Sequence, residues 1–185
     1  NRDTYDAIVH PGKLSANWSI FETGARFRFA DLEIETFSVP HDASDPVGFL
    51  FRWGGDDLFQ PLRVIAWVLD IGYITNLVRQ KIAEADLLVL EANYDSALLE
   101  QDPKRPWSVK QRIQSRHGHL SNQAACELLA EGGLGRLKTV WLAHISRDCN
   151  SPQAIREAFL PIGSGGRRSF ELCLFNHASG KVEPL

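Results

Sequence analysis

The sequence contains no methionine in its 185 residues, not even at the first position. This absence favours one of two explanations: the sequence begins inside a longer polypeptide, or methionines have been omitted from it and some spacings are short by a residue. Cysteine is also scarce. The three cysteines, Cys126, Cys149 and Cys173, form no C-x-x-C pair, and a reducing, cytoplasmic location is the simplest interpretation.

Long apolar runs and an excess of positive charge are missing as well. No apolar run reaches membrane-spanning length, and the first residues lack the basic-then-apolar pattern of a secretion signal. No membrane partner is therefore expected. A net charge of −3 argues against non-specific electrostatic binding to nucleic acid. It does not exclude a nuclease, because metal ions and a few local Lys or Arg residues can hold a phosphodiester.

Short apolar runs and amphipathic stretches alternate along the chain, and the length suits a single well-buried domain. Apolar strands flanked by amphipathic helices predict an α/β layered domain that spans residues 1–185. Thr75, Ser121 and Ser151 are the predicted helix caps. The predicted strands are 26–29, 32–39, 47–53, 63–69, 87–90, 139–143 and 170–175, and the predicted helices are 76–85, 107–116, 121–131 and 152–159.

Five polar side chains follow apolar runs, at the points where strands end. Strand ends gather reactive groups in layered folds, because rigid strands hold what the next loops expose. Two histidines and an aspartate in such positions indicate a hydrolytic metal centre, and a glutamate with a further histidine indicates its acid–base partners. These residues are His41, Asp70, Glu91, His119 and His144.

Each of these residues also has an ordinary structural interpretation. His41 is compatible with a loop histidine bonded to a nearby aspartate, and His144 with a structural histidine. Asp70 needs a partner because an unpaired buried charge is costly, and that partner is either a cation or the N-terminus of the next helix. Glu91 is compatible with a helix cap or a salt bridge. The ordered set favours a site more strongly than any single member.

His119 lies between Gly118 and the predicted cap Ser121, so its ring is expected near a helix N-terminus, where anions such as phosphate are favoured. Paired with a carboxylate, this histidine would keep one tautomer and could protonate a leaving group. The stretch before it is basic, which by default means a solvated helix face, but beside a metal site it would grip phosphate. The basic residues are Lys104, Arg105, Lys110, Arg112 and Arg116.

These motifs together resemble the distal part of the metallo-β-lactamase fold. The similar runs are TFSVPHDASDPVGFLF, WVLDIGY, LLVLEANYD, RIQSRHGHLSNQAA and WLAHISRDCNSP, in the family's order. They resemble most the YycJ/WalJ-type hydrolases, which are related to tRNA 3′-processing and β-CASP nucleases, and the similarity extends from Asn1 to Phe175. It implies an αββα sandwich, in which two mixed sheets pack face to face with helices outside.

The resemblance implies a role for each of the five residues. His41 matches the histidine that ligates the first metal, Asp70 the aspartate that bridges two metals, and His144 the histidine that ligates the second. Glu91 and His119 match the carboxylate–histidine pair of the nuclease branches. In that pair the histidine donates a proton to the leaving oxygen.

One hallmark of the family is absent. The H-x-H-x-D-H motif supplies four metal ligands upstream of all the runs above, and the sequence contains no such run. We therefore expect the domain to be incomplete at its N-terminus. A chain without that motif would lose half of one sheet and most of its metal affinity, and these residues alone are not expected to be an active enzyme.

For the intact protein, the resemblance implies metal-dependent hydrolysis of a phosphodiester in nucleic acid. Two divalent ions, Zn²⁺ or Mn²⁺, would activate a bridging water, with Asp70 acting in both the metal centre and catalysis. His119, oriented by Glu91, would be the proton donor. The residues expected to hold phosphate are Ser121, Asn122, Arg112, Arg116 and Lys110.

Two alternative functions stay open at this stage. One is a small-molecule hydrolase of the same fold, acting on a cyclic phosphodiester, a thioester or a lactone. The other is a non-catalytic binding module in which the histidines are structural. The sequence does not decide between DNA and RNA, exo- and endonuclease action, or monomer and homodimer. Trp18, Trp53 and Phe59 are candidates for exposed aromatic residues at an interface.

Overall fold

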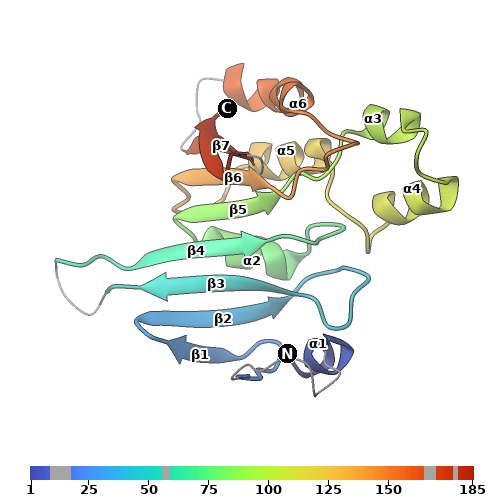
Figure 1. Ribbon diagram of the computed structural model, residues 1–185. Helices are drawn as coiled ribbons and strands as arrows, with labels where there is room; N and C mark the ends of the chain where they lie inside the picture. Colours follow the sequence, from blue (N-terminus) through green and yellow to red (C-terminus); the bar gives the residue numbers. More distant parts are fainter. Residues whose placement is uncertain (9–17, 56–58, 165–169, 177–178) are drawn as a thin grey trace.

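One mixed β-sheet organises the chain (Figure 1). The computed structural model describes residues 1–8, 18–55, 59–164, 170–176 and 179–185. Within these ranges, eight strands lie in the sheet in their order along the chain. The strands are β1 (Arg26–Phe29), β2 (Leu32–Ser38), β3 (Val47–Trp53), β4 (Arg63–Val68), β5 (Leu87–Glu91), β6 (Thr139–Ala143), β7 (Glu171–Asn176) and β8 (Lys181–Pro184).

The middle of the sheet is parallel and both ends are antiparallel. Strands β1 to β4 pair antiparallel, β4 to β7 pair parallel, and β8 returns antiparallel to β7. Parallel strands place their carboxyl ends at one edge, where the loops that follow β4, β5 and β6 meet. The helices are α1 (Arg2–Ile8), α2 (Asn76–Ala83), α3 (Ser96–Gln101), α4 (Trp107–Gln114), α5 (Asn122–Ala130) and α6 (Pro152–Ser164).

The hydrophobic core lies between one face of the sheet and helices α2, α5 and α6. In β4 every second residue, Val64, Ala66 and Val68, is buried in this core. The helices add apolar stripes that include Ile82 in α2 and Leu128 in α5. Figure 1 shows these three helices on the same side of the sheet, with α3 and α4 beyond the carboxyl ends of β4 and β5.

The opposite face of the sheet is also apolar. Trp67, Val89, Trp141 and Phe175 line a cavity of about 120 Å³ there, and Trp67 is 42% exposed. The described residues therefore form one sheet and one helical layer, with a second apolar sheet face. The expected αββα sandwich has a second sheet on such a face.

Most predicted elements are confirmed, with boundary shifts of a few residues. The Thr75, Ser121 and Ser151 side chains accept the backbone N–H groups expected of helix caps. The last predicted helix ended at residue 159, but α6 continues to Ser164 through Pro161. Sequence patterns did not indicate three short elements, α1, α3 and β8, which have four to seven residues each.

No helix in the described part of the chain has the length and apolar character needed to cross a bilayer. All three cysteines are buried free thiols. Of the aromatic residues predicted to be exposed, Trp18 is 46% and Phe59 89% exposed, whereas Trp53 is half-buried.

Candidate active site

The loop after β4 carries Asp70 to the carboxyl edge of the sheet. Its neighbour Gly72 lies so close to the next loop that an added Cβ would meet the Arg116 carbonyl oxygen at 2.3 Å. A Cβ on Gly118 would likewise lie 2.1 Å from the Ile113 carbonyl oxygen. Glycine is therefore required at both positions, and this close packing holds the Asp70 loop against the segment that carries His119.

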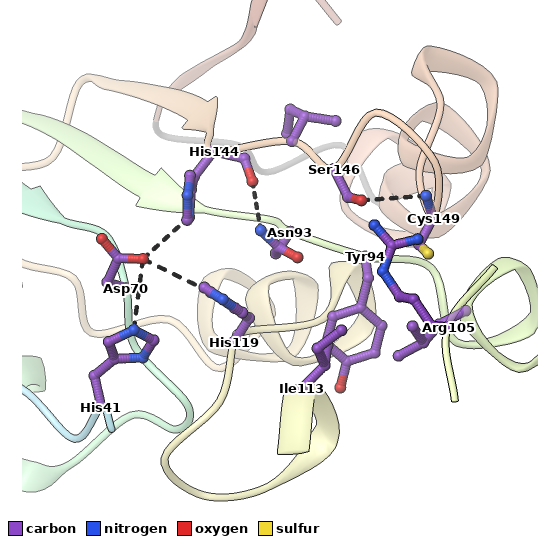
Figure 2. A pocket seen from close by; sticks show the side chains of 12 residues that line it. His41, Asp70, Asn93, Tyr94, Arg105, Ile113, His119, His144, Ser146 and Cys149 are labelled. Atoms are coloured by element: carbon purple, nitrogen blue, oxygen red, sulfur yellow. Dashed lines mark hydrogen bonds and ion pairs between the residues drawn. The ribbon is translucent and has the colours of Figure 1, made fainter. Parts of the chain in front are cut away.

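Asp70 lies among three imidazole rings (Figure 2). Its Oδ1 atom is 3.8 Å from His41 Nε2, 3.8 Å from His119 Nδ1 and 3.6 Å from His144 Nδ1. These separations exceed hydrogen-bond length, and about half of the Asp70 side chain is exposed. The carboxylate is thus close to all three histidines and remains accessible to a ligand from solution.

Glu91, the last residue of β5, is the fully buried centre of the site. Its Oε1 accepts hydrogen bonds from His119 Nδ1 at 2.6 Å and from His144 Nδ1 at 2.8 Å. Its Oε2 accepts the Ile71 backbone N–H at 2.8 Å. One carboxylate therefore fixes two imidazoles and the loop that holds Asp70.

These contacts set the charge state of Glu91 and His144. Burial alone would raise the pKa of the Glu91 carboxyl, but the hydrogen bonds from His119 and His144, with the Ile71 N–H, hold that pKa below its ordinary value. The Glu91 hydrogen bond raises the pKa of His144, against the opposing effect of burial. The pair is therefore stabilised as a carboxylate with a protonated imidazole when no metal is bound.

The hydrogen bonds also define which nitrogen of each ring can bind a ligand. His41 Nδ1 lies 2.9 Å from the Gly118 carbonyl oxygen, which can only accept, so this nitrogen carries the proton. His119 and His144 direct Nδ1 at Glu91 in the same way. When the ring is neutral, Nε2 of each of the three histidines is the atom that can ligate a metal or accept a proton.

The donor set fits a divalent metal. Imidazole nitrogen and carboxylate oxygen are ligands for Zn²⁺ and Mn²⁺. Two atoms that are each about 2.1 Å from one ion lie within about 4.2 Å of each other, and the 3.8 Å between His41 Nε2 and Asp70 Oδ1 meets that limit. Metal-compatible atoms of Asp70, Glu91, His119 and His144 lie within 4.8 Å of one another.

Two of these residues occupy a backbone region that non-glycine residues rarely adopt. Asp70 has φ of 51° and His144 has φ of 57°. A left-handed conformation at a non-glycine residue costs free energy, and such positions cluster at functional sites. The two strand ends therefore turn sharply to present their side chains to the same point.

The structure separates the five predicted phosphate-binding residues into two groups. Asn122 is 1% exposed and pairs with Asn150 through two amide hydrogen bonds, and the buried Lys110 donates from Nζ to the Glu100 carbonyl oxygen. These two side chains have internal partners and support the fold. Asn122 and Lys110 were predicted from their positions in the sequence, which contain no information about these internal partners.

The other three members lie nearer to the histidine cluster. Arg112 is exposed and pairs with Asp42, beside His41. The exposed Arg116 guanidinium lies 4.2 Å from the centre of the Tyr73 ring. Ser121 caps α5 by accepting the Ala124 N–H. The two exposed arginines place basic side chains at the edge of the site, whereas the Ser121 oxygen is already bonded within the fold.

A pocket of about 420 Å³ extends from the histidine cluster along α3 and α4 (Figure 2). Its wall also contains side chains that the sequence analysis did not place among the five site residues. Some of them follow strands β5 and β6, and Arg105 precedes α4, but Leu99 and Ile113 lie within α3 and α4, where no local signal marks them. The additional wall residues are Asn93, Tyr94, Leu99, Arg105, Ile113, Ile145, Ser146 and Cys149.

Comparison with known proteins supports the resemblance found in the sequence. Residues 2–145 match the family described as "Beta-lactamase superfamily domain". The chain is 31% identical over 178 residues to exodeoxyribonuclease YycJ of Bacillus anthracis, covering 93% of this chain and 64% of that protein. It is 33% identical over 154 residues to exodeoxyribonuclease WalJ of Streptococcus pneumoniae, covering 81% of this chain and 54% of that protein.

Solved structures show the same fold. The metallo-beta-lactamase fold protein YhfI from Bacillus subtilis aligns with a TM-score of 0.56 at 15% identity, over 88% of this chain and 53% of YhfI. Zn²⁺-bound PqqB from Methylobacterium extorquens aligns with a TM-score of 0.51 at 17% identity, over 89% of this chain and 50% of PqqB. The chain thus spans between half and two thirds of the length of these proteins. By its sequence and its fold, it belongs to the beta-lactamase superfamily, as a metallo-β-lactamase-fold protein similar to YycJ and WalJ.

Proposed function

We propose that this chain is part of a metal-dependent nuclease that hydrolyses phosphodiester bonds in DNA. The observation that carries the proposal is the Glu91 carboxylate, which holds His119 and His144 beside Asp70 and His41. The names of the YycJ and WalJ relatives, both exodeoxyribonucleases, support DNA as the substrate and action from an end.

In this proposal, His41 and Asp70 contribute to a first metal ion, and Asp70 and His144 to a second. When bound, two divalent ions such as Zn²⁺ or Mn²⁺ lower the pKa of a water molecule and neutralise phosphate charge. The half-exposed Asp70 carboxylate, near all three rings, suits a bridging role. Glu91 is buried and already accepts three hydrogen bonds, which suits a residue that orients ligands.

His119 is the proposed proton donor to the leaving oxygen. Because Nδ1 bonds to Glu91, Nε2 is the ring nitrogen left to donate a proton to a phosphodiester in the pocket that His119 lines. The Glu91 hydrogen bond holds the ring in position, and transfer of the proton to the leaving oxygen completes bond cleavage. Arg112 and Arg116, on the exposed rim, are proposed to hold neighbouring phosphates.

The test compares two histidines of one loop in the native full-length protein. His119→Ala removes the proposed donor, whereas His117→Ala changes an exposed side chain two residues away that does not line the pocket. With linear DNA and Mn²⁺, we expect His119→Ala to lower kcat by about 10²–10⁴-fold and His117→Ala to leave it unchanged. Bound metal, measured by mass spectrometry of the eluted ions, should be equal in both variants.

Full turnover by His119→Ala at normal metal content would overturn the proton-donor role. A thioester or a small cyclic phosphodiester that is hydrolysed while DNA is inert would instead identify a small-molecule hydrolase of the same fold. A native protein that binds no divalent ion, with a melting temperature indifferent to chelators, would support a non-catalytic module.

A further inference from the structure

The pocket beside the histidine cluster has one strongly basic side chain in its wall, Arg105. Figure 2 shows His41 and Asp70 at one side of the pocket and Arg105, with Ser146 and Cys149, at the other. The proposed chemistry is confined to the first side. Metal binding and proton donation leave the side of the pocket that contains Arg105 without a function.

Arg105 is held in one orientation by two carboxylates. Its Nη1 donates to Asp102, whose side chain is only 4% exposed, and its Nη2 donates to Asp148 at 3.1 Å. Among the described residues these are its two acceptors, so three of its five N–H groups stay available. A guanidinium fixed in this way needs little further ordering to bind an anion with two parallel hydrogen bonds.

The wall between Arg105 and the histidines combines apolar and polar side chains. Leu99 is fully buried, Tyr94 is 7% exposed, and Ile113 packs against the cluster to which both belong. Such a wall suits a nucleoside, whose base packs on apolar surface and whose sugar finds polar partners such as Ser146. A ligand that fills this pocket therefore combines a nucleoside with an anion at the end remote from the histidines.

The positive and negative charges around Arg105 are equal in number, and this limits how an anion can be recognised there. Lys104 and Arg105 carry two positive charges, and Asp102 and Asp148 carry two negative ones, with Lys104 Nζ 2.6 Å from Asp148. No excess positive field surrounds Arg105. Recognition would come from directed N–H donors, which favour a terminal phosphate with several free oxygens over a passing phosphodiester.

We infer that this pocket accepts the terminal nucleotide of a DNA strand and that Arg105 binds the terminal phosphate of that nucleotide. The inference rests on the proposed nuclease function, since it places the bond to be cleaved at the histidine cluster and the strand end at Arg105. Binding of the terminal phosphate would explain why such an enzyme cleaves DNA from an end. Both 5′- and 3′-terminal phosphates offer the same chemistry, and the substrates below distinguish them.

The experiment uses the native full-length protein with four otherwise identical oligonucleotides, ending in 5′-phosphate, 5′-hydroxyl, 3′-phosphate or 3′-hydroxyl. The native protein should show at least about a ten-fold preference in kcat/KM for the phosphorylated end of one polarity. Arg105→Gln should abolish the preference, mainly through KM. Arg105→Lys should retain part of it, because a lysine keeps the charge but loses the two-pronged geometry.

Arg79→Gln is the matched control, because Arg79 is also paired with a carboxylate, Glu131, but lies on α2 outside the pocket. This variant should keep the full preference. Thermal melting and metal content of Arg105→Gln check that loss of the Asp102 and Asp148 contacts has not disturbed the fold.

A binding measurement separates this inference from the proposed function. The titrated ligands are thymidine dinucleotides with a 5′-phosphate, with a 3′-phosphate and without a terminal phosphate. Tighter binding of a phosphorylated form that Arg105→Gln removes would support the subsite even if no DNA were cleaved. Cleavage of DNA with equal rates for all four ends, and equal dinucleotide affinities, would overturn the subsite and leave the nuclease proposal standing.

Discussion

Strand β5 has a buried carboxylate at each end, and the two are held by different kinds of partner. At its start, Asp86 accepts the Val64 backbone N–H at 2.9 Å and two bonds from Arg136, with Lys138 Nζ at 3.5 Å. At its end, Glu91 accepts one backbone N–H and two imidazole N–H groups. Both carboxyls have a pKa below the ordinary value, despite burial that would raise it.

The difference lies in what the partners can do. A guanidinium stays charged at every pH at which the protein is folded, so Asp86 is fixed in one state and connects strand β4, strand β5 and the loop before β6. An imidazole can lose its proton, bind a metal or donate to a substrate. Both carboxylates are stabilised by hydrogen bonds in the interior. Asp86 stabilises the fold at the amino end of the parallel strands, whereas we propose that Glu91 supports catalysis at their carboxyl end.

The largest expected effect comes from neutralising the carboxylate at the carboxyl end of β5. Glu91→Gln replaces the carboxylate by an amide that cannot accept both Nδ1–H groups with equal strength, so His119 and His144 lose their fixed tautomer. We expect kcat on DNA to fall by about 10²–10⁴-fold. Asp86→Asn is the matched change at the other end of β5, and it should leave kcat within about two-fold once the protein is fully folded.

Steady-state kinetics at a temperature well below both melting transitions measures this contrast. Equal losses of kcat in the two variants would mean that Glu91 acts only through the fold, as Asp86 does. Metal content must be compared in parallel, because a lower affinity at His144 would reduce turnover without any loss of proton donation.

Sequence patterns predicted which candidate residues lie close together better than they predicted the partners of each side chain. His41, Asp70, Glu91 and His144 lie at or just after the carboxyl ends of β2, β4, β5 and β6, which meet at one edge of the sheet. His119 instead precedes α5, next to its cap Ser121. The strand and helix periodicities likewise placed most elements. These patterns depend only on neighbouring residues, so they can be detected without knowledge of the tertiary structure.

Long-range contacts were beyond such signals. Arg105 and Lys110 belong to one basic stretch, yet Arg105 lines the pocket and Lys110 bonds to the Glu100 carbonyl oxygen, because the turn between α3 and α4 directs them differently. Asn122 was expected to hold phosphate, but α5 buries it against Asn150. The contacts of Glu91 with His119 and His144 join residues that are 28 and 53 positions apart in the sequence.

A smaller effect, on stability alone, is expected at the structural end of β5. Asp86→Asn leaves the Val64 N–H and Arg136 without their charged acceptor, and should lower the free energy of unfolding by about 1–3 kcal/mol in urea titrations. The loss is below that of a fully buried ion pair because Arg136 remains partly solvated, with its side chain 44% exposed. Glu131→Gln, which breaks the exposed pair with Arg79, should cost less than about 1 kcal/mol. A similar cost for both variants would contradict a structural role specific to Asp86.

The smallest effect is a difference in pH dependence between the two ends of β5 in metal-free protein. The pKa values of Asp86 and Glu91 are lowered in the fold, so the stability that each carboxylate contributes is present above its ordinary pKa, 3.8 or 4.5, and is lost as the pH falls through the lower folded value. Both ends therefore weaken in acid.

Only the Glu91 end should also weaken in base. The pKa of His144 is raised from 6.5, so its contribution is complete below that pH and disappears as the pH rises through the folded value. In EDTA, the melting temperature of the native protein and of Asp86→Asn should decline between pH 6 and pH 9 more steeply than that of Glu91→Gln. Parallel profiles for all three proteins would contradict the raised pKa of His144. The proposed contrast between the two ends of β5 would then rest on geometry alone, because Glu91 would not stabilise the protonated form of His144.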